Sequence, residues 1–128
     1  MMKMLLMVGL GSFAGGVLRF LLTRFVQINS MSSFPWGTTA VNLLGCLVLS
    51  VLYGLFSRGL LLHTETRLFL TVGLCGGFTT MSTFIYETSR LAQDAEYWAA
   101  SGYFAATFVG CGLAFWAGTL AIRLLLKG

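Results

Sequence analysis

The sequence contains few charged residues. Asp, Glu, Lys and Arg make up 9% of its 128 residues, whereas soluble domains carry about a quarter. Hydrophobic residues account for 57%. This balance is typical of a membrane protein. Lysine occurs only as Lys3 and Lys127, so the interior of the chain carries none.

The groups that most enzymes require are also missing. The sequence has no nucleophile–base pair, no metal-binding cluster and no phosphate-binding loop, so we expect no catalytic activity. His63, the single histidine, has no metal-binding partner nearby. Lys3 leads directly into a span-length apolar segment without a small-residue cleavage site, and we therefore expect an uncleaved first helix.

Cysteine is limited to Cys46, Cys75 and Cys111. Their number is odd, and their spacing matches no metal motif. Each lies deep within an apolar segment, where a thiol behaves as a small hydrophobic group. We expect no structural disulfide.

Four apolar segments have about the 20 residues that a bilayer requires. They cover residues 4–26, 36–56, 68–86 and 97–122. The connections between them are short and leave no room for a soluble domain. The sequence therefore predicts an all-α membrane protein whose residues 1–128 form a single four-helix transmembrane domain.

Four crossings place both termini on one side of the membrane. The basic residues on that side are Lys3, Arg58, Arg67, Arg123 and Lys127. The opposite side holds Arg24 and Arg90, with Arg19 ambiguous. The positive-inside rule favours cytoplasmic termini by a small margin, and so weak a bias also fits insertion in both orientations. We assign the net charge of +4 to membrane-flanking anchors and expect no nucleic-acid partner.

The third segment contains a sequence that disfavours a helix. Gly76 and Gly77 are followed by four hydroxyl residues, Thr79, Thr80, Ser82 and Thr83. Each glycine costs a helix about 1 kcal/mol relative to alanine. A broken helix is tolerated in a bilayer only where its freed carbonyls and amides face protein, water or an ion. We expect the third helix to be broken in the middle of the membrane, at the glycine pair and the hydroxyl residues that follow it. We expect this break to bind or conduct ions.

Aromatic rings flank this segment at Phe78 and Phe84. The edge of a phenyl ring is electropositive and can approach a small anion. Simple packing is the more frequent role of phenylalanine.

Polar residues recur on two other segments. Thr38 and Asn42 are four residues apart and share a helix face; Asn42 can bond a neighbouring helix or contact a ligand. In the fourth segment Tyr103, Thr107 and Cys111 recur every four residues and form a stripe along one face. That stripe either lines a pathway or consists of locally bonded side chains.

Two charged residues, Arg19 in the first apolar segment and Glu87 directly after the third, have alternative roles. Arg19 either snorkels to the membrane surface as an anchor or holds a structural or vestibule position. Glu87 either pairs with Arg90, one helical turn away, at a surface or vestibule, or carries protons.

Three pieces of sequence resemble the Fluc/CrcB family of fluoride channels, along essentially the whole chain. They are residues 15–20 (GGVLRF), 37–45 (GTTAVNLLG) and 76–84 (GGFTTMSTF), the last followed by Glu87. In the third piece Met81 stands where the family usually has phenylalanine. Its thioether lacks a fixed electropositive ring edge.

This resemblance implies a dual-topology, antiparallel homodimer in the bacterial inner membrane, surrounded by lipid, that passively exports toxic fluoride. It implies a sodium ion at the dimer centre, held by the backbone carbonyls of Gly76 and Thr79. The implied fluoride pathway comprises Asn42, Met81, Ser82, Thr83, Phe84, Tyr103 and Thr107, with Cys111 at its end. Vestibule or structural positions are assigned to Arg19, Thr38 and Glu87.

Two other functions fit a chain of this size. A small proton-coupled multidrug exporter needs a membrane-embedded glutamate in its first span, and residues 4–26 contain none. A non-transporting membrane scaffold gains nothing from disrupting its own third helix.

Overall fold

Long apolar runs form long helices because a helix satisfies its own backbone groups in lipid. The computed structural model describes residues 1–60 and 63–127, and within them it contains helices and no strands. Four helical spans are long and apolar enough to cross a membrane, with mean hydropathies between 1.6 and 2.0. They are Met2–Ser30, Trp36–Ser57, Thr64–Gln93 and Tyr97–Leu125. The predicted all-α class and the four spans of a multi-pass membrane protein are confirmed, each span extending somewhat beyond its apolar segment.

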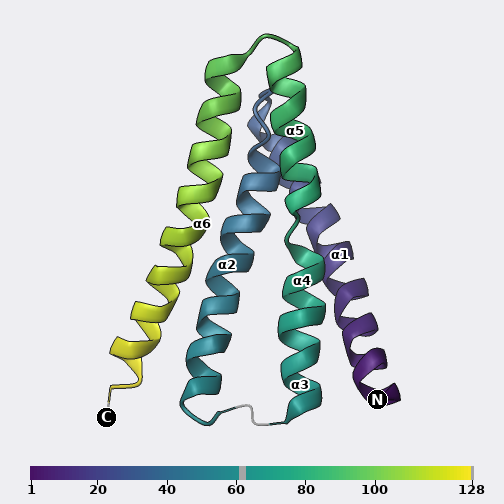
Figure 1. The fold of residues 1–128 in the computed structure, drawn as a ribbon, viewed down its shortest axis with the longest axis vertical. Coiled ribbons are helices and arrows are strands. Elements are labelled where there is room, and N and C mark those ends of the chain that lie inside the picture. The colour runs from purple at the N-terminus through teal and green to yellow at the C-terminus, as the bar shows by residue number, and fades with distance from the viewer. Residues whose placement is uncertain (61–62, 128) are drawn as a thin grey trace.

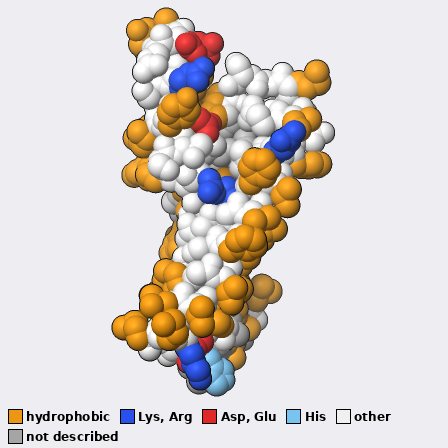
Figure 2. Space-filling view, turned by 90° about the vertical axis from the view of Figure 1, so that its right-hand side faces the viewer, with side chains coloured by type: hydrophobic (Ala, Val, Ile, Leu, Met, Phe, Trp, Pro, Cys, Tyr) orange, Lys and Arg blue, Asp and Glu red, His pale blue; other side chains and the backbone are white. Residues whose placement is uncertain are grey.

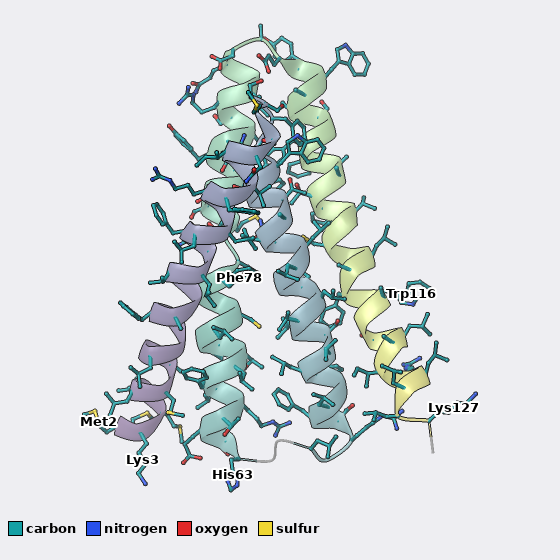
Figure 3. All side chains as sticks on the ribbon, turned by 180° about the vertical axis from the view of Figure 1, so that it is seen from behind. Met2, Lys3, His63, Phe78, Trp116 and Lys127 are labelled. Carbon is teal, nitrogen blue, oxygen red and sulfur yellow. The ribbon has the colours of Figure 1, made fainter. Side chains whose placement is uncertain are left out.

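Three spans are single helices, and the third consists of four consecutive pieces. The single helices are α1 (Met2–Ser30), α2 (Trp36–Ser57) and α6 (Tyr97–Leu125). The third span comprises α3 (Thr64–Leu68), the π-helix η1 (Phe69–Cys75), α4 (Gly76–Phe78) and α5 (Met81–Gln93). Both termini lie at the same end of the molecule (Figure 1). Met2, Lys3, His63 and Lys127 gather at that end (Figure 3).

The outer surface carries large apolar side chains. Phe13, Trp98 and Trp116 are 73%, 93% and 63% exposed. Trp116 points away from the other helices in Figure 3. On the face shown in Figure 2, hydrophobic side chains extend along the whole length and charged ones are few. A lipid environment accepts such a surface, whereas water does not.

Helix α1 packs against the third span through glycines. A Cβ atom at Gly11 would lie 2.9 Å from the Cα atom of Gly73, and one at Gly77 would lie 2.6 Å from the carbonyl oxygen of Ser12. Gly15 is likewise buried, against the backbone of the third span. The small-residue positions of α1 therefore allow two backbones to approach closely.

The third span is interrupted at two threonines. Thr79 (φ −85°, ψ 157°) and Thr80 (φ −150°, ψ 117°) are extended and lie between α4 and α5. The sequence predicted a break at the glycine pair and the threonines that follow it; Gly76 and Gly77 are themselves helical, and the extended residues begin two positions after Gly77. Close packing on α1 holds Gly77 in place, whereas β-branched threonine readily adopts extended backbone.

Candidate functional site

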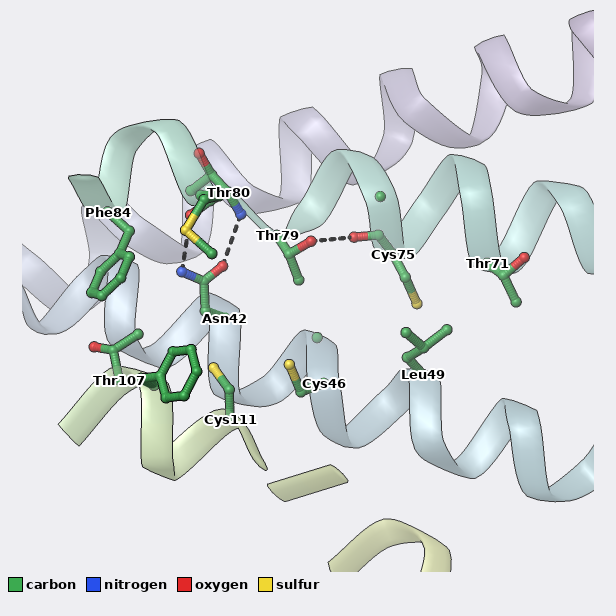
Figure 4. A pocket seen from close by; sticks show the side chains of 14 residues that line it. Asn42, Cys46, Leu49, Thr71, Cys75, Thr79, Thr80, Phe84, Thr107 and Cys111 are labelled. Atoms are coloured by element: carbon green, nitrogen blue, oxygen red, sulfur yellow. Dashed lines mark hydrogen bonds between the residues drawn. The ribbon is translucent and has the colours of Figure 1, made fainter. Parts of the chain in front are cut away.

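A cavity of about 390 Å³ lies between α2, the third span and α6. Its walls include the residues drawn in Figure 4. The predicted pathway and ion-site residues among them are Asn42, Gly76, Thr79, Met81, Phe84 and Thr107. Side chains from three spans that are far apart in the sequence thus line one space beside the interruption.

Asn42 bridges α2 to the interruption. Its Nδ2 donates to the carbonyl of Thr80 at 3.0 Å, and the N–H of Thr80 donates to its Oδ1 at 2.8 Å. Both bonds are drawn in Figure 4. The sequence left open whether this amide bonds another helix or a ligand; in the structure it bonds another span. The amide has two N–H donors, and the bond to Thr80 uses one of them.

These bonds change which carbonyls of the third span have a donor. In a continuous helix the N–H of Thr80 would bond the carbonyl of Gly76, four residues earlier. Here Asn42 takes that N–H. Similarly, the N–H of Thr83 would bond the carbonyl of Thr79, but it donates to Oγ1 of Thr80 at 3.3 Å. The carbonyls of Gly76 and Thr79 therefore lose their helical donors.

Arg19 bonds the carbonyl that lies between these two. Its Nε donates to the carbonyl oxygen of Gly77 at 3.1 Å. Arg19 also lines a second cavity, of about 540 Å³, together with Arg24, Thr38 and Thr83. The bond to Gly77 gives Arg19 a structural contact, and Arg19 also borders the second cavity.

Thr38 and Glu87 form a partly buried polar contact. Oγ1 of Thr38 donates to Oε1 of Glu87 at 2.6 Å, and Thr38 is 2% exposed. Arg90, the alternative partner considered for Glu87, donates instead to the hydroxyl of Tyr86 at 3.2 Å. Thr38, which lies one helical turn before Asn42 on α2, therefore joins α2 to α5.

Tyr103 is fully buried beside this contact. Its ring meets Phe84 edge-on, with the centroids 5.1 Å apart. Its hydroxyl has no hydrogen-bond partner within the described part of the chain. Glu87 and Thr38 are among the polar groups near that hydroxyl.

The predicted pathway residues lie in four places. Asn42, Met81, Phe84 and Thr107 line the first cavity, and Thr83 lines the second. Tyr103 lies in the core cluster with Phe84. Ser82 is exposed, with its hydroxyl 3.4 Å from that of Thr80.

Sequence reasoning missed two residues of this site. Thr39 shares a hydrogen bond of 3.1 Å with Thr107 on α6, and Cys46 lines the first cavity. Thr39, Asn42 and Cys46 are spaced by three and four residues, which places them on one face of α2. That spacing is visible in the sequence, but it does not reveal which helix lies opposite.

The sequence of residues 6–119 matches the family model described as CrcB-like protein, Camphor Resistance (CrcB). A protein of Phocaeicola vulgatus named fluoride-specific ion channel FluC is 49% identical over 75% of this chain and 78% of its own length. Relatives with the same name in Chlorobaculum tepidum and Geobacter sulfurreducens are 44% and 40% identical. The match to the Chlorobaculum tepidum protein covers 96% of this chain and 97% of that protein. The match to the Geobacter sulfurreducens protein covers 97% of this chain and 100% of that protein.

Proposed function

The chain belongs to the CrcB-like family, and we propose that it is a fluoride channel that passively exports fluoride from the cell. Its relatives are named ion channels rather than enzymes. The observation that carries the proposal is the cavity beside Thr79 and Thr80, where polar groups of α2, α6 and the interrupted span converge.

The cavity offers fluoride neutral hydrogen-bond donors. Asn42 and Thr107 both line it, and Thr39 bonds Thr107. Fluoride is strongly hydrated, so a pathway must replace its water with several such donors. A fixed ammonium in the pathway would hold the anion too tightly, because conduction requires sites that the ion can leave. The absence of lysine between residues 4 and 126 agrees with this requirement.

Ring edges complete the pathway that we propose. Phe84 is 3% exposed and lines the cavity with Met81. The edge of the Phe84 ring can contact the anion, whereas the thioether of Met81 cannot do so in the same way. Ser82, Thr83 and Tyr103 continue the pathway toward its ends.

We assign a structural sodium ion to the carbonyl oxygens of Gly76 and Thr79. Both carbonyls have lost their helical donors to the side chains of Asn42 and Thr80. Oxygen ligands suit a hard cation, and an unpaired carbonyl in lipid costs several kcal/mol, so these two residues fit such an ion. A bound sodium would supply a fixed positive charge close to the cavity.

We further propose that the whole chain acts as one four-helix domain in an antiparallel homodimer of dual topology, embedded in the lipid of the bacterial inner membrane. Two features support this assembly. The basic residues are only weakly biased to one side, and α1 and α6 present exposed apolar side chains such as Phe13 and Trp116. Arg19, Thr38 and Glu87 would lie at the vestibules of such a dimer.

Fluoride efflux from liposomes containing the purified protein tests this function. We expect fluoride to leave in response to its own gradient, without a proton gradient, while chloride is retained. Liposomes without protein are the control. Equal efflux of both anions would contradict the channel assignment. Flux that requires a proton gradient would favour an exporter, and no flux would favour a scaffold.

A further inference from the structure

Four sulfur atoms line the first cavity. They belong to Cys46 on α2, Cys75 at the end of η1, Met81 at the start of α5 and Cys111 on α6. All three cysteines are free thiols. Sulfur is a soft ligand that selects soft metal ions over the hard cations bound by oxygen. The cavity therefore combines two kinds of ligand chemistry, sulfur on its walls and carbonyl oxygen at the interruption.

Cys46 on α2 and Cys111 on α6 both line this cavity. Their side chains lie next to each other in Figure 4, whereas that of Cys75 lies farther along the third span. Both side chains are half-buried, whereas Cys75 is buried and comes from the third span. In the described part of the chain, no group of three or more His, Cys, Asp or Glu residues could hold a metal ion. Two thiols are thus the ligand set that this geometry provides.

We propose that Cys46 and Cys111 form a two-coordinate site for a soft, thiophilic divalent cation such as Hg²⁺. Binding breaks two S–H bonds, forms two metal–sulfur bonds and releases two protons to water, and no electron is transferred. Two thiolates cancel the charge of a divalent cation. The bound site is therefore neutral, which suits a cavity in an apolar membrane interior. A monovalent soft cation would leave a net negative charge there.

The position of the site connects it with fluoride conduction. Cys46 lies one helical turn beyond Asn42, and Cys111 lies one turn beyond Thr107. A cation held between the two thiols occupies the cavity beside both donors and obstructs the passage of an anion. This consequence rests on the proposed function; the binding site itself does not.

Thiol protection tests the binding site without measuring transport. The purified protein is loaded with one equivalent of Hg²⁺, alkylated with N-ethylmaleimide in denaturant and mapped by peptide mass spectrometry. We expect the label on Cys75 alone, and no label in Cys75→Ser. In Cys46→Ser or Cys111→Ser the remaining member of the pair has lost its second ligand, so we expect it to be labelled together with Cys75. Labelling of Cys46 or Cys111 in the loaded wild-type protein, or protection of Cys75, would overturn the two-coordinate site.

Fluoride efflux then tests the obstruction. With each variant compared to its own mercury-free flux, we expect Hg²⁺ to reduce efflux at least tenfold in the wild type and in Cys75→Ser, and to leave at least half of it in Cys46→Ser and Cys111→Ser. Equal inhibition of all variants would overturn the obstruction. A wild-type protein that carries no fluoride before mercury is added would contradict the proposed function, while the labelling result would still decide the site.

Discussion

Asn42 holds both the N–H and the C=O of Thr80, through bonds of 2.8 and 3.0 Å. One side chain of α2 thereby satisfies two backbone groups that the interruption leaves without helical partners. The same contact removes the donor that the carbonyl of Gly76 would have in a continuous helix. Asn42 therefore stabilises the third span, and it also leaves the carbonyl of Gly76 without its helical donor.

Asn42→Ala should destabilise the protein and lower fluoride flux. Loss of two interhelical bonds is expected to cost about 1–2 kcal/mol, since single bonds of this kind average about 0.6 kcal/mol in membranes and an unpaired buried amide adds to the loss. Denaturant unfolding in detergent measures the first effect and liposome efflux the second. Asn29→Ala is the matched control, because Asn29 is exposed and bonds only within its own helix, to the carbonyl of Phe25. Equal effects of the two substitutions would contradict the role of Asn42.

Gly11→Ala should separate α1 from the third span. The added methyl group would lie 2.9 Å from the Cα atom of Gly73, and backbone cannot move aside as a flexible side chain can. We expect a loss of about 1–3 kcal/mol in the free energy of unfolding. Gly9→Ala makes the same change on the same helix with nothing within 4 Å. It should be neutral or stabilising by up to about 1 kcal/mol. Comparable losses in both variants would argue against the glycine contact.

Arg19→Gln should weaken the link between α1 and α4. The substitution removes both the positive charge and the bond from Nε to the carbonyl of Gly77. We expect a loss of about 1–2 kcal/mol in the free energy of unfolding, because hydrogen bonds from charged donors exceed neutral ones and part of this bond is screened by solvent. Arg24→Gln removes the same charge from the same cavity at an exposed position and is the control. If the two variants unfold alike, the bond to Gly77 contributes nothing measurable.

Met81→Phe should raise the rate of fluoride efflux. A ring at this position would add an electropositive edge that the thioether lacks, and the side chain is 64% exposed, so the larger group has room. A several-fold increase in liposome efflux is the expected result. An unchanged rate would mean that residue 81 does not contact the anion.

Phe84→Ile should lower fluoride efflux with little change in assembly. Isoleucine keeps the residue apolar and fills much of the space, but it removes the ring that meets Tyr103 with centroids 5.1 Å apart. Efflux and size-exclusion chromatography separate the two effects. Normal efflux from a normally assembled variant would remove Phe84 from the pathway.

Hydropathy predicted the spans because the bilayer requires a segment that crosses it to be apolar along its whole length. The second and fourth helices begin at Trp36 and Tyr97, where the apolar segments were expected to begin. The location of the interruption could not be predicted in this way. Glycine propensity pointed to Gly76 and Gly77, but both are helical, and Gly77 packs closely on α1, a contact that only the folded arrangement reveals.

The residue types of the candidate site could be predicted from the sequence, but their contacts could not. The residue types were visible in the sequence: an amide in the second span, hydroxyls in the third and fourth, and a ring at Phe84. The hydrogen-bond partners of these residues were not visible. Thr39 and Thr107, for example, are 68 positions apart in the sequence, and the bond between them depends on how α2 and α6 are rotated relative to each other. Helical periodicity gives the face of one helix, whereas register between helices follows from close contacts such as Gly118 against Ser50.

The order of the bridging residues along the chain has a consequence for biosynthesis. Asn42 precedes Thr79 and Thr80 in the chain, so in co-translational insertion its carboxamide would reach the bilayer before the interrupted span does. The N–H and C=O groups of Thr80 can then exchange water for that amide on entry. A circular permutant that begins with residues 64–93 would insert these groups before any partner exists, and we expect it to reach the membrane in lower yield.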